Sequence, residues 1–258
     1  IRLLPNTSGV RDAEEAVFAR PEKRALLPEI EVNEKGFFID GEKVKFKGVC
    51  LHHDLGSIGA EWNASAFRRQ MRLLKEIGAN AIRTSHNQPN PELLDICDEE
   101  GIYVMAESFD SWKRPKVANG YNLWYEDWWK RDLEQLVKVC RDHPCVVMYS
   151  LGNEIAESTA PEGPRMIKEM QDYIHSLDPS RPCTMGNHHP LAAAKRGVNA
   201  IQDIAGANYH LSEYIPTRAL ARHGVILGTE TSSAISTRGF YRFPDDVRKY
   251  RDSPDADG

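Results

Sequence analysis

The chain has 258 residues, a formal net charge of -5 and a hydrophobic content of 41%. This length allows one α/β barrel or two smaller domains, and the negative charge argues against nucleic acid or an anionic membrane surface as a partner, because both need a basic face. No run of about eighteen apolar residues exists, and the N-terminus lacks a basic segment followed by an apolar one. We therefore expect neither a membrane span nor a signal peptide.

The first part of the chain predicts a linker followed by a hairpin. Residues 1–30 have no sustained hydrophobic period, so we expect a linker or an edge strand that belongs to a neighbouring domain. Residues 31–48 contain strand-like runs, and Asp40-Gly41 is a typical two-residue hairpin turn between them. The second arm of this hairpin leads into a first barrel strand.

From residue 65 onward, helical and strand patterns alternate. Ser65 can cap a helix whose apolar residues recur at spacings of three and four, and Asn90 with Pro91 opens the next helix. The predicted helices are residues 65–77, 91–100, 128–141, 165–177 and 214–222. The predicted strands are residues 49–51, 81–84, 102–106, 146–154, 183–186, 204–208 and 225–229.

This alternation predicts a (β/α)8 TIM barrel of the α/β class. Strands separated by helices form parallel sheets with right-handed crossovers, and seven such strands favour a closed barrel over an open sheet. Residues 232–258 are polar and contain no recognisable eighth strand or final helix. We therefore expect either that the chain is part of a longer polypeptide, with the barrel incomplete at its C-terminal end, or that these residues form an irregular eighth element. Residues 1–30 form the linker and residues 31–258 the barrel domain in this assignment.

Two of the predicted strands end in a glutamate. The stretch VVMYSLGNE ends at Glu154 and the stretch VILGTE ends at Glu230, and active sites of such barrels lie at the C-terminal ends of the strands. A single glutamate at such a position can merely cap a strand or pair with an arginine. Two of them suit the cleavage of a glycosidic bond, which needs one carboxyl group to protonate the leaving oxygen and a second on the other face of the sugar.

The other strands also end in polar side chains. Carboxylates, imidazoles, amides and a phenol offer the donors and acceptors that sugar hydroxyls require. They are His52, His53, Asp54, Arg83, His86, Glu107, Asp110, Asn153, Asn187, His188, His189, Asn208, Tyr209 and His210. A metallohydrolase is the rival interpretation, with zinc bound by His52, His53, His188 and His189. It is disfavoured because no two histidines are spaced by a helical turn and no aspartate takes the bridging position.

The loop after the third strand is the most aromatic part of the chain. Trp112 and Trp124 are the candidates for a platform that stacks against a sugar, whereas Trp128 and Trp129 stand near a helix start and are expected in the core. The five cysteines are an odd number without close Cys-x-x-Cys pairs, so we expect reduced thiols in the core. These patterns leave a cytoplasmic or periplasmic location and assembly into a homo-oligomer open.

Several motifs together resemble the catalytic barrel of family 2 glycoside hydrolases, and most closely that of bacterial β-galactosidases. The segments FKGVCLHHD, AIRTSHN, SLGNE and GTE occur in this order between about residues 31 and 230, and a joint match is more specific than any single motif. The resemblance implies a retaining hydrolase that cleaves terminal β-linked sugars from an oligosaccharide or other β-glycoside, with β-galactosides as the first choice. A β-glucuronidase or β-mannosidase of the same family, or a catalytically silent carbohydrate-binding fragment, is the alternative.

The resemblance also implies roles for individual residues. Glu154 matches the general acid/base and Glu230 the nucleophile. Asn153 matches the residue that contacts the sugar 2-hydroxyl, and Tyr209 matches the tyrosine that hydrogen bonds the nucleophile. The full set expected to bind the sugar or to surround the two carboxylates is His52, Arg83, His86, Asn153, Tyr209, Glu107 and, from the aromatic pattern, Trp112.

The sequence departs from the family pattern at three places. In some members the strand-three glutamate that Glu107 matches helps to hold magnesium, but Ala106 stands where the family often has aspartate, so we expect no metal and no cofactor. After Glu230 comes Thr-Ser-Ser in place of an aromatic residue and a histidine, so sugar contacts there must differ. The family also carries β-sandwich domains before the barrel, of which residues 1–30 and the hairpin are at most a remnant.

Overall fold

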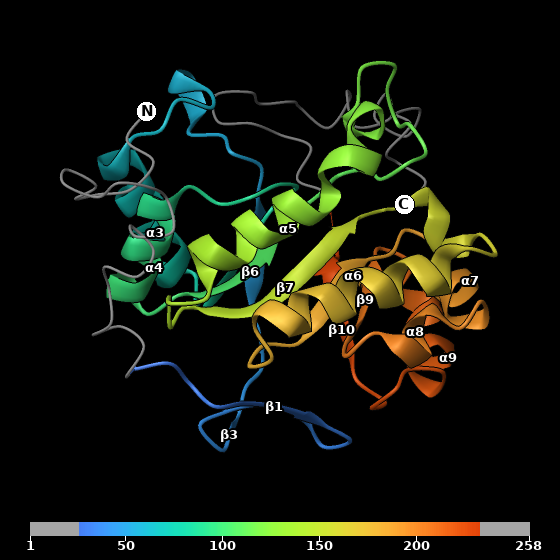
Figure 1. Ribbon diagram of the computed structural model, residues 1–258. Coiled ribbons are helices and arrows are strands. Elements are labelled where there is room, and N and C mark those ends of the chain that lie inside the picture. Colours follow the sequence, from blue (N-terminus) through green and yellow to red (C-terminus); the bar gives the residue numbers. More distant parts are fainter. Residues whose placement is uncertain (1–25, 233–258) are drawn as a thin grey trace, which may run out of the picture.

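The computed structural model describes residues 26–232, and a curved parallel sheet forms its centre (Figure 1). Five strands are hydrogen bonded in sequence order, namely β4 (Gly48–Leu51), β5 (Ala81–Thr84), β6 (Tyr103–Glu107), β7 (Val146–Asn153) and β8 (Cys183–Gly186). Two further strands, β9 (Ala205–Asn208) and β10 (Ile226–Glu230), pair in parallel, and β9 lies next to β8. The predicted parallel α/β barrel is confirmed, with seven of its strands within the described residues.

Helices connect these strands and cover the outer face of the sheet (Figure 1). The longer ones are α3 (Ala64–Glu76), α4 (Pro91–Glu100), α5 (Tyr125–Cys140) and α6 (Gly163–Leu177). The shorter ones are α7 (Pro190–Lys195), α8 (Val198–Ile201) and α9 (Tyr214–Ala219), and single 3-10 turns occupy Gly56–Ile58, Tyr121–Leu123, Ala156–Thr159 and Leu211–Glu213. Between residues 26 and 232 no helix combines the length and the apolar composition needed to cross a membrane.

Local capping residues set the ends of the first two long helices. The Asn63 side chain accepts a hydrogen bond from the Ala66 N–H at 2.9 Å, so α3 begins before Ser65 and the predicted cap was wrong. Asn90 accepts from the Glu92 N–H at 2.8 Å and starts α4 as predicted. Gly101 ends α4 with a φ of 67°, a left-handed conformation that glycine adopts without steric cost.

The core lies between the sheet and the surrounding helices. Every residue of β7 is buried, because helices cover its outer face and other strands surround its inner face. Leu133 of α5 and Ile167 of α6 are fully buried in the same cluster. All five cysteines are free thiols, as predicted, and four of them are buried.

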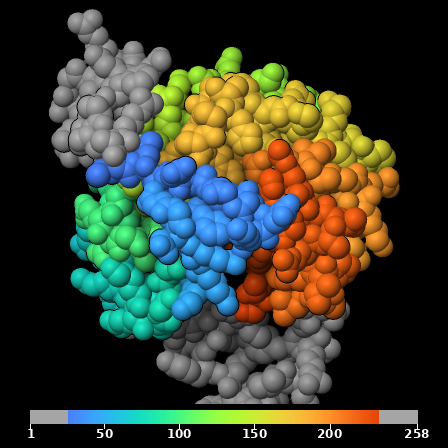
Figure 2. Space-filling view, turned by 90° about the horizontal axis from the view of Figure 1, so that it is seen from below, coloured from blue at the N-terminus to red at the C-terminus, as the bar shows by residue number. Residues whose placement is uncertain are grey.

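The predicted hairpin is present and closes the N-terminal end of the barrel. It consists of β1 (Ile30–Asn33), β2 (Gly36–Ile39) and β3 (Glu42–Lys43), paired antiparallel. Phe37 and Ile39 turn toward the barrel and pack in one cluster with buried side chains of β6 and β7. Figure 2 shows the hairpin in blue across this face, between the early and the late part of the chain.

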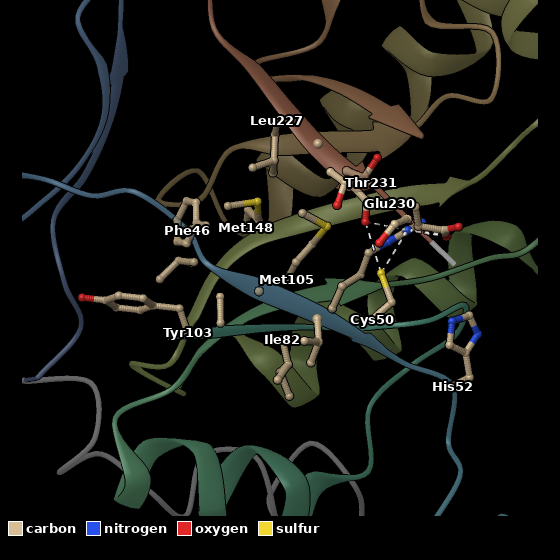
Figure 3. Close-up of a pocket in the computed structure, with 18 of the residues that line it drawn as sticks. Phe46, Cys50, His52, Ile82, Tyr103, Met105, Met148, Leu227, Glu230 and Thr231 are labelled. Atoms are coloured by element: carbon tan, nitrogen blue, oxygen red, sulfur yellow. Dashed lines mark hydrogen bonds and ion pairs between the residues drawn. The ribbon is translucent and has the colours of Figure 1, made fainter. Parts of the chain in front are cut away.

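A cavity of about 620 Å³ lies between the first and last described strands of the barrel. The Cys50 thiol of β4 is 3.1 Å from the Thr229 carbonyl of β10, but the two strands form no ladder. Apolar side chains such as Phe46, Met148 and Leu227 line one end of this cavity, and Glu230, Cys50 and His52 lie toward its other end (Figure 3). The expectation of a missing eighth unit falls on residues 233–258, which lie outside the described residues.

Candidate active site

The two predicted catalytic glutamates stand at the C-terminal ends of the strands. Glu230 is the last residue of β10, and Glu154 follows directly after β7. Glu154 has a φ of 46°, in the left-handed region that non-glycine residues rarely adopt. His53, Tyr209 and His210 share this conformation after β4 and β9, with φ values of 53°, 51° and 42°. Such backbone strain costs about 1–3 kcal/mol per residue and persists where the surrounding structure holds it.

The Glu230 carboxylate is bound at both oxygens. Arg83 Nη1 donates to Oε1 at 2.7 Å, and the Tyr209 hydroxyl donates to Oε2 at 2.7 Å. His86 Nε2 lies 3.5 Å from Oε1. The side chain of Glu230 is 12% exposed, so these contacts fix its orientation while part of it still faces open space. Charge-assisted hydrogen bonds of this kind are short and roughly twice as strong as neutral ones.

Arg83 is the residue that links the carboxylates of the site. It is 3% exposed, and besides Glu230 it binds Glu107 through Nε at 2.9 Å and Nη2 at 2.7 Å. Nη2 also donates to Asn153 Oδ1 at 3.0 Å. Burial alone would lower the pKa of Arg83, but Glu107 and Glu230 outweigh it and raise that pKa further above its usual range.

Glu107 is fully buried beneath the site. Its Oε2 accepts hydrogen bonds from Arg83 and from the Ser150 hydroxyl at 2.6 Å, and its Oε1 lies 2.7 Å from His86 Nδ1. Protein donors thus occupy both oxygens of this carboxylate. A magnesium ion at Glu107 does not fit this arrangement, because the ion needs carboxylate oxygens of its own and room for several waters.

The Glu154 carboxylate belongs to the same network and is more open. Asn208 Nδ2 donates to Glu154 Oε1 and to Asn153 Oδ1, both at 3.0 Å. His188 Nδ1 lies 3.2 Å from the same Oε1. The side chain of Glu154 is 26% exposed. A continuous chain of contacts therefore runs from Glu230 through Arg83, Asn153 and Asn208 to Glu154, and the more exposed end is Glu154.

The remaining predicted site residues lie around this network. The His52 ring packs edge-on against the ring of His86, with centroids 4.9 Å apart, and His52 lines the cavity with Tyr209 and Glu230 (Figure 3). Burial, with His86 as the next cause, lowers the pKa of His52, so its ring is neutral near pH 7. The structure thus brings together all the predicted site residues except Trp112.

The prediction that Trp112 forms a sugar platform was wrong. Its side chain is fully buried, and the indole N–H donates to the Leu151 carbonyl at 3.1 Å. Trp124 is 59% exposed and stays a platform candidate. The core prediction held for Trp129, which is 8% exposed, but not for Trp128, which is 44% exposed. These two are adjacent on α5, and adjacent helical residues point in directions about 100° apart, so only one of them faces the core.

Sequence reasoning did not assign a role to Asn208, although this side chain joins the two halves of the network. Its Oδ1 also accepts from the Thr229 hydroxyl at 2.6 Å. The signal for Asn208 was its place at the end of β9, directly before Tyr209. Asp110 was likewise named at a strand end without a role of its own, and it accepts from Asn153 Nδ2 at 3.1 Å and from Lys116 Nζ at 2.8 Å.

The four histidines proposed for a zinc hydrolase do not gather around one point. His52 packs on His86, whereas the group within the described residues that contains His188 and His189 takes His210 as its third member.

The chain matches the family model described as "Glycosyl hydrolases family 2, TIM barrel domain" over residues 30–224. A β-galactosidase from Bacteroides ovatus is 37% identical, and the alignment covers 82% of this chain and 29% of that protein. A β-glucuronidase from Pongo abelii is 34% identical, over 64% of this chain and 25% of its own length. A solved structure of a glycosyl hydrolase family 2 member from Bacteroides cellulosilyticus has a TM-score of 0.74 and 35% identity, and covers 79% of this chain and 26% of that one.

The chain therefore spans less than a third of the length of each of these three proteins. The family match nevertheless includes most of the chain and all but the last of the strands that form the site. The chain belongs to glycoside hydrolase family 2, within its TIM barrel domain.

Proposed function

We propose that this chain carries the active site of a retaining glycoside hydrolase that cleaves terminal β-linked sugars, with β-galactosides as its substrates. The supporting observation is that Glu154 and Glu230 lie at strand ends of one barrel mouth and share one hydrogen-bond network. Retaining glycosidases need two carboxyl groups about 5 Å apart. A nucleophile held by two donors and a second, more open carboxyl group suit the two roles.

Glu230 is the nucleophile and Glu154 the general acid/base in this proposal. Glu230 attacks the anomeric carbon while Glu154 gives its proton to the glycosidic oxygen, and the alcohol leaves. The sugar is then covalently bound to Glu230. Glu154, now ionised, takes a proton from water, and the water oxygen attacks the anomeric carbon. This second displacement frees Glu230 and releases the sugar with its original configuration. Tyr209 and Arg83 position Glu230 for both steps.

A neutral sugar suits the charges of the site. The two side-chain cations among the described residues that contact the network, Arg83 and Lys116, are each already paired with a carboxylate. A uronic acid carboxylate would have to compete for them. The named relatives include a β-galactosidase from Bacteroides ovatus and a β-glucuronidase from Pongo abelii, so both substrates belong in the test.

We also propose that hydrolysis needs no metal or other cofactor. The support is that protein donors already occupy both oxygens of Glu107. Activity that is unchanged after exhaustive chelation is the expected result, and loss of activity that magnesium restores would contradict it.

The first experiment is hydrolysis of 4-nitrophenyl β-galactoside, β-glucuronide, β-mannoside and β-glucoside by the protein that carries this chain. We expect the β-galactoside to be cleaved fastest. Glu230→Gln should lose at least about 10⁴-fold in rate, and Glu154→Gln about 10²–10⁴-fold. Glu99→Gln is the matched control, because Glu99 pairs with Arg68 on the surface, and it should keep full activity.

Azide distinguishes the two roles. With Glu154→Ala, azide should accelerate breakdown of the glycosyl-enzyme and give the β-glycosyl azide. With Glu230→Ala, azide can take the place of the nucleophile and should give the α-glycosyl azide. Identical products from both variants would contradict the assignment. A folded protein that binds galactose but cleaves none of the four glycosides would instead support the silent carbohydrate-binding alternative.

A further inference from the structure

Three histidines gather at the barrel mouth beside Glu154. His188 and His189 follow β8, and His210 follows β9, so two neighbouring strands deliver them. Their ring centroids are 4.5, 5.2 and 5.7 Å apart in pairs. One nitrogen atom from each ring lies within 4.8 Å of those of the other two. We call these three residues the histidine cluster.

The histidine cluster contains a ring nitrogen that no described residue hydrogen bonds. His210 Nε2 is buried and makes no hydrogen bond to any described residue. The His189 ring contacts the rings of both His188 and His210. A buried polar atom without a partner is rare and calls for an explanation, and a shared cation would supply one.

Two other groups of potential metal ligands occur within the described residues, and they differ from the histidine cluster. They are Asp98 with His143 and Cys145, and His175 with Cys183 and Asp203. In both, the histidine is already paired with the aspartate, at 2.7 and 2.9 Å. Burial also raises the pKa of both thiols well above the usual range, so they keep their protons. Of the three groups, the histidine cluster is the one with an unpaired nitrogen that can bind a metal ion, His210 Nε2.

We propose that the histidine cluster binds one divalent transition-metal ion, such as zinc, through three imidazoles. Zinc binds imidazole nitrogen at about 2.0–2.1 Å and accepts three protein ligands with a fourth position open. The three rings must therefore turn inward from their present spacing. His188 Nδ1 lies 3.2 Å from Glu154 Oε1, which leaves the Nε2 of His188 for the ion. A carboxylate that holds the second nitrogen of a metal-binding histidine is a common supporting contact.

Such an ion would inhibit the hydrolase, and this part of the inference rests on the proposed function. An ion held by the histidine cluster lies beside the Glu154 carboxylate, because Glu154 Oε1 is 3.2 Å from His188 Nδ1. The ion therefore takes up space next to the acid/base, where the glycosidic oxygen must come to receive its proton. Metal binding and sugar cleavage are therefore expected to exclude one another.

Calorimetric titration of the chelator-treated protein with zinc tests the site directly. We expect one zinc ion per chain at micromolar or lower concentration, and at least about tenfold weaker binding in His189→Ala. The His189 side chain is exposed and, although His189 is the N-cap residue of α7, makes no capping hydrogen bond, so this variant should fold. His223→Ala is the matched control, because it removes an imidazole outside the cluster, and it should bind zinc like the wild type. Cobalt should give the visible absorption of a tetrahedral site in the wild type and lose it in His189→Ala.

The activity arm uses the β-glycoside that is cleaved fastest. Zinc should inhibit the wild type, a chelator should reverse the inhibition, and His189→Ala should keep its activity at the same zinc concentration. Equal zinc binding by the wild type and by His189→Ala would overturn the site. Binding that depends on the cluster but leaves hydrolysis unaffected would overturn the inhibition. Because the calorimetric result needs no substrate, failure of the proposed hydrolase and failure of the metal site give different outcomes.

Discussion

Two buried arginines, at opposite ends of the barrel, are bound in different ways. Arg181, 2% exposed, lies at the N-terminal end of β7, where it donates to the backbone carbonyls of Val146 and His143 and pairs with one carboxylate, Asp178. Arg83, 3% exposed, lies at the mouth and pairs with two carboxylates, Glu107 and Glu230. Arg181 is therefore neutralised by one carboxylate, and backbone carbonyls accept its other hydrogen bonds. The two carboxylates at Arg83 together carry one more negative charge than the arginine neutralises. A nucleophile needs this remaining negative charge.

Replacing the two arginines should give the largest effects and separate the two ends. Arg83→Met and Arg181→Met each leave a buried carboxylate without its cation, which typically lowers the free energy of unfolding by about 3–5 kcal/mol. Only Arg83→Met should also lower the rate of hydrolysis per folded molecule, by at least about 10²–10³-fold. Urea denaturation gives the stability, and activity is normalised to the folded fraction. Equal loss of activity in folded Arg181→Met and in Arg83→Met would contradict this comparison. If the methionine variants do not fold, Arg83→Lys and Arg181→Lys replace them in the same measurements.

Shortening the Phe37 side chain of the hairpin should lower stability without changing activity. Phe37 is 5% exposed and packs against the lower end of the barrel, so Phe37→Ala should cost about 3–5 kcal/mol of unfolding free energy. Trp124, 59% exposed, is the aromatic counterpart, and Trp124→Ala should change stability by no more than about 0.5 kcal/mol. If Trp124 stacks against a sugar, its variant should raise KM. A Phe37→Ala protein as stable as the wild type would show that the hairpin does not brace the barrel.

Removing one tyrosine hydroxyl at each end of the barrel also distinguishes a catalytic from a structural role. Tyr209 donates to Glu230 at 2.7 Å, and fully buried Tyr149 donates to Asp178 at 2.8 Å. Tyr209→Phe should lower kcat by about 10–100-fold, because it removes one donor from the nucleophile. Tyr149→Phe should leave kcat unchanged and lower the free energy of unfolding by about 1.5–3 kcal/mol. Parallel kinetics and thermal denaturation test both, and interchanged outcomes would contradict the division of roles.

The smallest effect is a pH dependence of stability at the lower end. His175 Nε2 lies 2.9 Å from Asp203, and this hydrogen bond raises the pKa of His175. Stability from the pair is therefore fully present below the unfolded pKa of histidine, about 6.5, and is lost as pH rises through the higher folded value. The difference in unfolding free energy between the wild type and His175→Gln should shrink between pH 6 and 9. A difference that grows with pH would have the wrong sign.

The fold was predictable from local patterns. The bounds predicted for β5 and β8 coincide with those observed, because short apolar runs between turn residues specify buried parallel strands. The short helices α7 and α8 were missed, because their six and four residues are too few to reveal a helical period. The first helix was predicted but its cap was not, since Ser and Asn are both good caps and only the observed hydrogen bond decides between them.

The candidate site was predictable residue by residue but not contact by contact. Strand ends and family motifs predicted Glu154, Glu230 and Arg83, yet Arg83 and Glu230 are 147 positions apart in the sequence. No local pattern reveals a pairing over that distance. Trp112 shows the converse limit, because its position in an aromatic loop suggested an exposed platform, whereas a single backbone acceptor at Leu151 lets the whole indole turn inward.

The left-handed residues at the mouth have a consequence for sequence drift. His53, Glu154, Tyr209 and His210 hold conformations that glycine or asparagine adopts more easily. In a gene copy freed from selection for hydrolysis, glycine at each of these positions would relieve about 1 kcal/mol or more of strain. Such a descendant should be more stable than its parent while it loses the acid/base and the partner of the nucleophile. We therefore expect inactive but sturdy relatives to show their first replacements along this rim.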